Sequence, residues 1–328
     1  MARRNPAANA VIRGQAMDNF ADRLIAEIEA KGTPACVGID PRLELLPLPL
    51  RRKFEKGGGS LRTIVGAIKA FSCEIVDIVA PLVPVVKPQI AFFEMYGWVG
   101  IQAYIEVARY ARRAGLIVLG DVKRGDIGST AEAYASGHLG QVAISGRPTE
   151  IWHEDAITVN PYLGTDAVEP FLKEVSARGK GIFVLVRTSN PSGAEVQDLG
   201  GQSPVYMSVA DRVAGWGRES VGKRGFSSVG AVVGATCPEE ARRIRDILPQ
   251  AIFLVPGYGA QGAGVADIRP AFRNDGMGAI VNSSRAVIFA YRRKPYDEQF
   301  GEKRWQEAVL AATKEMRRDL SAIYGGAL

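Results

Sequence analysis

Two carboxylates and one ammonium group lie close together in the segment 120–130. Asp121, Lys123 and Asp126 follow an apolar run, 116–119, that predicts a buried strand. Side chains two residues apart in a strand point to the same face, so we expect Asp121 and Lys123 to face the same way. Opposite charges at the end of a buried strand are unfavourable unless they pair or bind a ligand. The segment therefore predicts either a structural ion pair or a site that does chemistry.

The elements that must position these groups follow a regular alternation. Short apolar segments predict eight strands, at 35–40, 83–87, 116–119, 156–159, 181–186, 229–233, 251–255 and 278–281. Amphipathic segments predict helices between and around them, at 20–30, 61–80, 98–108, 130–142, 166–177, 206–216, 238–248 and 305–320. Parallel strands need long crossovers and are buried on both faces, which is why this alternation indicates a parallel sheet.

Eight such units predict an α/β protein with a (β/α)8 TIM barrel in a single domain. An open doubly wound sheet is the alternative, but Asp40-Pro41-Arg42 follows the first strand where a glycine fingerprint would be expected. We assign residues 16–328 to the barrel and residues 1–15, which lack the apolar core of a secretory signal, to a disordered tail. The segment 41–60 is predicted to be a long loop, and 189–203, rich in Gly, Ser and Asn, a mobile lid.

The composition narrows the class of function. Hydrophobic residues make up 47% of the chain, as in a globular protein with a sizeable core. The net charge of +6 is small for 328 residues and its basic residues are spread out, which favours an anionic small substrate over nucleic acid. No apolar run approaches the ~20 residues needed to span a membrane. Cys36, Cys73 and Cys237 are far apart and form no metal-ligand spacing, which favours free thiols in a reducing cytoplasm.

Polar and charged groups recur at the predicted carboxyl ends of the strands, where such barrels place their active sites. They are Asp40, Lys87, Asp121, Lys123, Asp126, Asn160, 187–190, Thr236, 256–262 and 282–285. We expect Lys87, Asp121, Lys123 and Asp126 to form an alternating array of charges. At about 4 Å and an effective dielectric near 20, each contact is worth roughly 4 kcal/mol, enough to keep a lysine protonated and aimed.

The segment after the seventh strand, 256–264, contains four glycines and Gln261. Glycine-rich backbone can turn its amides toward a phosphate, and barrel phosphate sites commonly follow strands seven and eight. Ser284 and Arg285, after the eighth strand, add backbone amides and a guanidinium fork. An ordinary turn would explain the glycines alone, but together these residues predict a phosphate site.

The two histidines, His138 and His153, do not lie at strand ends, so a hydrolytic triad is not supported. The run His153-Glu154-Asp155 could imitate a metal cluster. Because adjacent side chains diverge, we expect a solvated surface there and predict no metal site.

The pattern Asp121-x-Lys123-x-x-Asp126-Ile127-x-x-Thr130 resembles the signature of the orotidine 5'-phosphate decarboxylase family. The resemblance runs from about residue 36 to 289 and includes a Thr-Ser-Asn turn, Gly-Ala-Gln-Gly and the arginine after strand eight. Arg-Gly after Lys123 is similar to the longer bacterial branch of the family. Related phosphosugar lyases share Asp-x-Lys-x-x-Asp, so the combination is more specific than the motif.

This resemblance implies decarboxylation of orotidine 5'-phosphate to UMP, the last step of de novo pyrimidine nucleotide synthesis, without metal or organic cofactor. Lys123 would protonate C6 of the pyrimidine, and Asp121 would lie against the scissile carboxylate. Lys87 and Asp40 would hold the ribose, with Lys87 also pairing with Asp121. An ammonium fixed between carboxylates can stabilise a carbanion that has no adjacent electron sink and then protonate it.

The resemblance also implies a homodimer in which Asp126 and Thr130 reach into the partner's site. Ser189 would bind the pyrimidine edge, and Ile127 would be a further substrate contact. The phosphate would be clamped by Gln261, Ser284 and Arg285. Two other functions stay open: a metal-dependent phosphosugar decarboxylase, such as a keto-gulonate-phosphate decarboxylase, and a non-catalytic protein that binds phosphate ligands or RNA.

Overall fold

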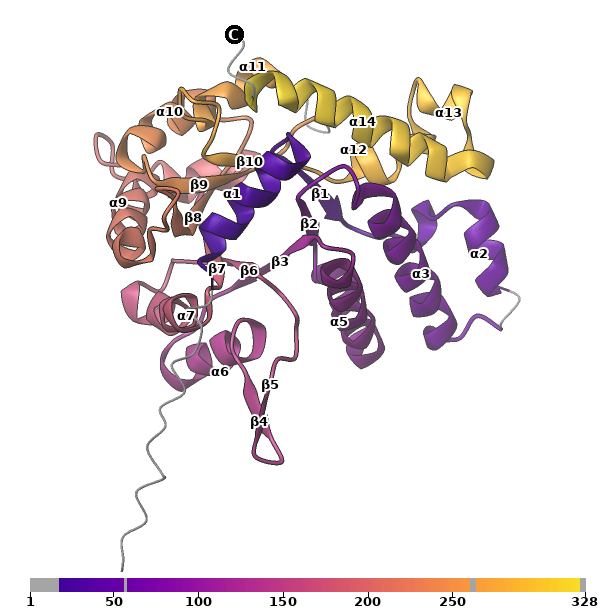
Figure 1. Cartoon of the computed structure of the whole chain (residues 1–328), viewed down its shortest axis with the longest axis horizontal. Helices are drawn as coiled ribbons and strands as arrows, with labels where there is room; N and C mark the ends of the chain where they lie inside the picture. The colour runs from indigo at the N-terminus through magenta and orange to yellow at the C-terminus, as the bar shows by residue number, and fades with distance from the viewer. Residues whose placement is uncertain (1–17, 56–57, 260–263, 325–328) are drawn as a thin grey trace, which may run out of the picture.

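Eight parallel strands close into a barrel (Figure 1). The computed structural model describes residues 18–55, 58–259 and 264–324. Around the barrel the strand order is β1, β10, β9, β8, β7, β6, β3, β2. The strands are β1 Ala35–Ile39, β2 Val85–Pro88, β3 Ile117–Arg124, β6 Ala156–Val159, β7 Gly181–Arg187, β8 Ser227–Val233, β9 Ala251–Pro256 and β10 Ala279–Ser283. The predicted (β/α)8 barrel and its eight strands are confirmed.

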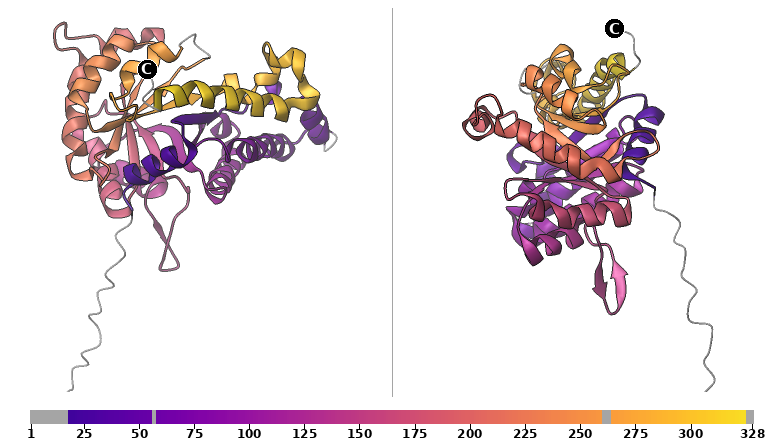
Figure 2. Two further views of the ribbon diagram at one scale, coloured as in Figure 1. Left: turned by 45° about the horizontal axis from the view of Figure 1, so that its top comes forward. Right: turned by 90° about the vertical axis from the view of Figure 1, so that its left-hand side faces the viewer.

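Helices cover the outside of the barrel, and α14 packs against α3 to join the two ends of the helical layer (Figure 2). The helices are α1 Phe20–Lys31, α2 Leu48–Glu55, α3 Leu61–Val79, α4 Ala91–Glu94, α5 Gly97–Arg113, α6 Gly128–His138, α7 Thr165–Arg178, α8 Ala194–Gln197, α9 Val205–Gly217, α10 Pro238–Ile247, α11 Val265–Ile268, α12 Arg285–Ile288, α13 Tyr296–Gln299 and α14 Trp305–Tyr324. Short 3-10 turns lie at Leu43–Leu45, Pro191–Gly193, Arg218–Ser220, Arg269–Ala271, Ala290–Arg292 and Glu302–Arg304. Seven of the predicted helices are confirmed with shifted ends, and the eighth, predicted over 130–142, is shorter than expected.

The core has two layers because each strand buries both of its faces. Inward-facing side chains fill the barrel, and outward-facing ones pack against the helices. The interior is closed at the amino ends of the strands by α1, whose Phe20, Leu24 and Ile28 pack against it (Figure 1). This helix begins at Asn19, whose side chain accepts a hydrogen bond from the amide of Asp22, and ends at a glycine in left-handed conformation.

Two sequence predictions about connections are wrong. The segment 41–60 is not a long loop, because it contains the 3-10 turn Leu43–Leu45 and α2. Proline is compatible with the first helical turn, where its missing N–H has no intrahelical partner, so the prolines did not exclude a helix. The helix predicted over 130–142 ends at His138 and is followed by an antiparallel hairpin, β4 Val142–Ile144 and β5 Arg147–Thr149.

The turn of this hairpin consists of Ser145 and Gly146, both at positive φ (51° and 75°), as in a tight two-residue hairpin turn. The hairpin projects away from the body of the molecule in both figures. The predicted tail, residues 1–15, lies outside the described residues. Within the described part of the chain, no helix combines the length and apolar character needed to cross a membrane.

Candidate active site

Three charged side chains meet inside the carboxyl end of the barrel. The Nζ atom of Lys87 lies 2.7 Å from Oδ2 of Asp121, and that of Lys123 lies 2.5 Å from Oδ1 of the same carboxylate. Lys87 and Asp121 are buried, whereas the side chain of Lys123 is 49% exposed. One buried carboxylate therefore holds two ammonium groups, of which only Lys123 is open to a ligand.

The alternation of side chains along the strands explains the position of the buried pair. Val85 in β2 and Leu119 in β3 belong to the apolar filling of the barrel. Lys87 and Asp121 come two residues later and so point inward as well, one layer nearer the carboxyl end. The barrel interior is therefore apolar toward the amino ends of the strands and charged at their carboxyl ends.

The backbone around Lys123 is irregular. The strand predicted to end at residue 119 continues to Arg124, and its pairing with β6 shifts after Gly120, so that residues 121–123 lie opposite the single residue Thr158. Lys123 has φ 44°, in the left-handed region that non-glycine residues rarely adopt. The predicted pairing of Lys123 with Asp121 is confirmed, but a bulge produces it rather than regular alternation.

Thr158 is a residue of this site that the sequence analysis missed. Its Oγ1 accepts hydrogen bonds from the amides of Val122 and Lys123, at 3.0 and 2.9 Å, and donates to Oδ1 of Asp121 at 3.0 Å. The available signal was a hydroxyl residue within an apolar strand, two residues before the polar strand end at Asn160.

Electrostatic interactions keep the buried pair ionised. Burial disfavours the charged form of Asp121, but Lys87 and Lys123 outweigh it and hold the pKa of Asp121 well below its usual range. Burial likewise opposes the charge on Lys87, but Asp121 and Asp40 raise the pKa of Lys87 above its usual value. Burial raises the pKa of the nearby Cys36 thiol to about 12, so this thiol is neutral at pH 7.

Asp40 follows β1 at the same rim. Its Oδ1 is buried and has no hydrogen-bond partner among the described residues. Such an atom is unfavourable unless a ligand group donates to it. The neighbouring Gly38 allows β1 and β10 to approach, because a Cβ there would lie 1.9 Å from the hydroxyl of Ser284.

The other residues of the motif lie just before α6 and in its first turn. Oδ1 of Asp126 accepts a hydrogen bond from the amide of Ile127 at 2.8 Å, and Asp126 forms no ion pair within the described chain. Ile127 is 55% exposed, and Thr130 is exposed as well. The predicted array of four charges therefore has three members within one chain.

The segment after β7 is tied to Arg187 and Thr236 by polar contacts. Arg187, at the end of β7, forms ion pairs with Asp198 at 2.9 Å and Glu240 at 3.3 Å. Ser189 is half-buried, and its carbonyl accepts a hydrogen bond from the hydroxyl of Thr236. The predicted lid, 189–203, is thus tied at Asp198 to the buried guanidinium of Arg187.

Of the residues predicted to bind phosphate, Ser284 and Arg285 belong to the described part of the chain. Ser284 follows β10 and receives a hydrogen bond from Asn282, while Arg285 is exposed. A cavity of about 410 Å³ beside them is lined by Gly259, Arg285, Ala286, Phe289, Arg292 and Arg293. Gln261 lies outside the described residues. Three guanidinium groups around one hollow suit an anion.

The segment 153–155 is not the solvated surface predicted for it. Glu154 is fully buried and takes part in hydrogen bonds with the hydroxyl of Tyr104 and with Nδ1 of His138. Asp155 is also buried and accepts a hydrogen bond from the amide of Val118. These acids directly precede β6 and lie in the core, where their polar partners come from α1, α5, α6 and β3. No group of three or more possible metal ligands occurs in the described ranges.

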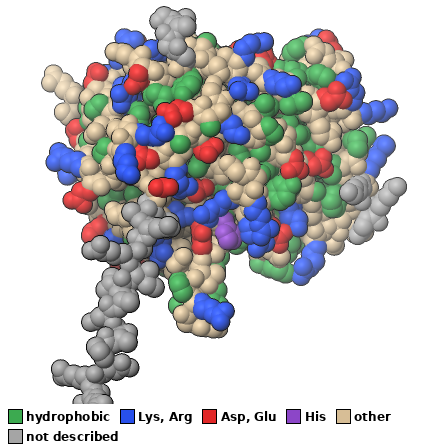
Figure 3. All heavy atoms as spheres, viewed as in Figure 1, with side chains coloured by type: hydrophobic (Ala, Val, Ile, Leu, Met, Phe, Trp, Pro, Cys, Tyr) green, Lys and Arg blue, Asp and Glu red, His purple; other side chains and the backbone are tan. Residues whose placement is uncertain are grey.

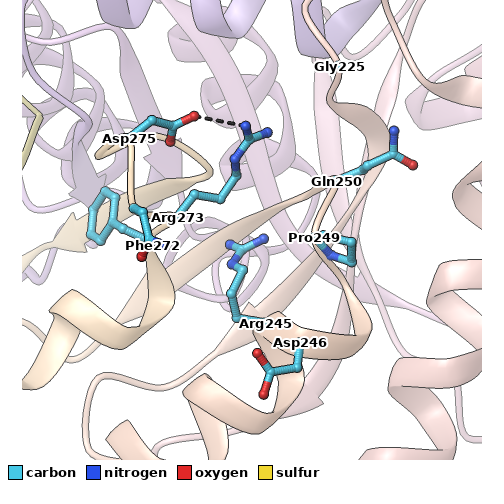
Figure 4. Close-up of a pocket in the computed structure, with 9 residues that line it drawn as sticks. Gly225, Arg245, Asp246, Pro249, Gln250, Phe272, Arg273 and Asp275 are labelled. Atoms are coloured by element: carbon cyan, nitrogen blue, oxygen red, sulfur yellow. Dashed lines mark ion pairs between the residues drawn. The ribbon is translucent and has the colours of Figure 1, made fainter.

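A cavity of about 720 Å³ lies at the opposite end of the barrel, where β8, β9 and β10 begin (Figure 4). Arg245 at its wall is buried, and its guanidinium donates to the carbonyls of Leu248, Ala251, Ala271 and Gly278. All five of its N–H groups are used, so this arginine holds the fold together and has no donor left for a ligand.

The surface in Figure 3 shows Lys and Arg interspersed with Asp and Glu. Among the described residues, this face carries no continuous basic stripe of the kind that tracks a nucleic-acid backbone.

A family model described as "Orotidine 5'-phosphate decarboxylase / HUMPS family" matches residues 34–295. This match spans most of the chain and every strand of the barrel. The chain belongs to the orotidine 5'-phosphate decarboxylase / HUMPS family. The predicted resemblance is thereby confirmed.

Curated relatives and solved structures agree with the family. Over 93% of this chain, it is 48% identical to orotidine 5'-phosphate decarboxylase of Rhodopirellula baltica and 39% identical to that of Caldicellulosiruptor bescii, with 99% of each relative covered. The structure of Leishmania donovani OMP decarboxylase superposes with a TM-score of 0.70 at 31% identity, over 94% of this chain and 99% of that one. In this decarboxylase family fold, Lys87, Asp121 and Lys123 form a charged triplet at the end of the barrel where (β/α)8 enzymes do their chemistry.

Proposed function

We propose that Lys123 is the proton donor in the decarboxylation of orotidine 5'-phosphate to UMP, the carbon–carbon lyase reaction of pyrimidine biosynthesis to which the family assigns this chain. The observation that carries the proposal is the shared carboxylate. Asp121 lies between the buried Lys87 and the half-exposed Lys123, so the Lys123 ammonium is fixed in direction yet open to a substrate.

In this reaction the bond between C6 and the carboxylate breaks, carbon dioxide leaves, and the electron pair stays on C6. A fixed ammonium stabilises the developing charge without reorganising at the moment of reaction. Lys123 then gives its proton to C6 and regains one from water. Asp121, which stays ionised, lies against the substrate carboxylate and favours its departure as neutral carbon dioxide.

The remaining contacts follow from the free groups at the rim. The unpartnered Oδ1 of Asp40 accepts a hydrogen bond from a ribose hydroxyl, and Lys87 lies beside Asp40. Ser189 binds the pyrimidine edge. The cavity at Arg285 supports a phosphate site there, to which Ser284 and Gln261 contribute. Binding energy from the phosphate orders the segment 189–203 as a lid over the substrate.

We further infer a cytoplasmic homodimer in which Asp126, Ile127 and Thr130 complete the partner's site. Asp126 forms no ion pair with Lys87 or Lys123 within the described chain, and Thr130 is exposed, which supports a role for both outside their own chain's site. Exposed apolar side chains occur near the same edge, on the connections after β2, β3 and β6, which supports an interface there. They are Met95, Trp98, Ile127, Tyr162 and Leu163.

The absorbance of orotidine 5'-phosphate tests the function directly. We expect purified protein in excess EDTA to remove the orotate absorbance and release UMP. A metal-dependent phosphosugar decarboxylase of the same family would leave the nucleotide unchanged in EDTA and turn over a keto-gulonate phosphate only when magnesium is restored. RNA binding without turnover would also refute the proposal.

A further inference from the structure

The hydroxyl of Thr158 is fully used. A hydroxyl has one proton to donate and two lone pairs that accept. The amides of Val122 and Lys123 occupy both lone pairs, so the proton must point at the third neighbour, Oδ1 of Asp121. Thr158 is 2% exposed, and water therefore does not compete for these bonds.

The three hydrogen bonds connect the carboxylate of Asp121 to the backbone at Lys123, and the relative position of these two groups must stay fixed. Oδ1 of Asp121 is also the atom that holds the ammonium of Lys123. The amide of Lys123 belongs to a residue in the left-handed region, which an L-residue leaves unless its surroundings hold it. One oxygen atom from the neighbouring strand thus fixes both the backbone and the side-chain partner of Lys123.

We propose that Thr158 is a positioning residue for the decarboxylation. It substitutes for the backbone acceptor that β3 loses at its bulge, and it holds Asp121 and Lys123 in one geometry. This inference rests on the proposed role of Lys123 as proton donor. Removal of the hydroxyl frees the bulge to relax, so the ammonium no longer points at the reacting carbon even though every charged group is still present.

The test compares Thr158→Ser, which keeps the hydroxyl, with Thr158→Ala and Thr158→Val, which remove it. Thr313→Val is the matched control, because Thr313 is also buried and its hydroxyl bonds only within α14, to the carbonyl of Val309. For each protein we would measure kcat and KM with orotidine 5'-phosphate, the melting temperature, and the circular dichroism spectrum.

We expect Thr158→Ala and Thr158→Val to lower kcat about tenfold or more with little change in KM, because misplacement of a catalytic group by about 1 Å is enough for such a loss. Thr158→Ser should restore most of kcat, and Thr313→Val should lower only the melting temperature. If Thr158→Val does not fold, the Ser and Ala variants decide the result.

Wild-type kcat in a folded Thr158→Ala protein would overturn the inference, as would a folded Thr158→Ser protein as slow as Thr158→Ala. Inactive wild-type protein would instead refute the proposed function itself. The two failures are therefore distinguishable in one set of assays.

Discussion

The Nζ atom of Lys87 and Oδ2 of Asp121 lie 2.7 Å apart in a part of the barrel that is almost closed to solvent. A buried pair of this kind strongly destabilises a protein when one partner loses its charge, because the other charge remains buried. The same contact that orients the site therefore also makes its stability depend on pH.

Asp121→Asn should lower the free energy of unfolding by about 3 kcal/mol at pH 7. The folded-state pKa of Asp121 lies below its unfolded value near 3.9, so its contribution is present above about pH 4 and is lost as the pH falls further. Urea unfolding at several pH values should show the gap narrowing by about 1.4 kcal/mol per pH unit below pH 4. Asp275→Asn, in an exposed ion pair with Arg273, should change stability by less than about 1 kcal/mol. A gap that stays constant down to pH 2 would contradict the assignment.

Lys123→Ala should abolish turnover while UMP still binds, since the proposed ribose and phosphate contacts lie elsewhere. Single-turnover assays and calorimetric titration with UMP would separate the two effects. Lys173→Ala, which removes a lysine exposed on α7, should behave like the wild type. A rate near that of the wild type in Lys123→Ala would exclude this lysine as the donor.

Lys123→Ala and Asp126→Ala, each inactive alone, should recover activity when their subunits exchange. Hybrid dimers would contain one site with both residues intact, so random mixing should give about a quarter of wild-type activity. Lys123→Ala mixed with Asp121→Ala is the control, because both lesions then fall in the half-site built by the charged triplet and no intact site forms. Proven exchange without recovered activity would remove Asp126 from the partner's site.

Arg245→Met should lower the free energy of unfolding by about 3 kcal/mol or more, since several buried carbonyls lose their donor. Because Arg245 lies at the far end of the barrel from the charged triplet, kcat and KM should not change. Arg242→Met, on the exposed side of the same helix, is the matched control and should have the same melting temperature as the wild type. A changed KM in Arg245→Met would show that the two ends of the barrel are coupled.

The sequence predicted the features that arise from regular repetition. Strands buried on both faces are continuous apolar runs, and the strand count then determines where the carboxyl ends meet. That rule was sufficient to bring Lys87 and Asp121 together although they are 34 residues apart.

The features that were missed depend on local departures from repetition. The bulge opposite Thr158 leaves no trace in the hydrophobic pattern, because its extra residues are themselves site residues. Glu154 and Asp155 look like surface residues by type, and the partners brought by α1, α5, α6 and β3 make their burial possible. The hairpin at 142–149 has a short turn and exposed strands, so it carries no apolar alternation to detect.

The helix α1 covers the amino end of a barrel whose interior is filled by apolar side chains, so the site opens toward solvent at the carboxyl end. The nucleotide is therefore expected to enter, and both products to leave, at that end. Slow release of UMP would then limit kcat even if bond cleavage were fast. Replacing Leu24 of α1 with a polar residue should let water reach the amino end of the barrel interior and lower the free energy of unfolding. The rates of substrate entry and product release should not change.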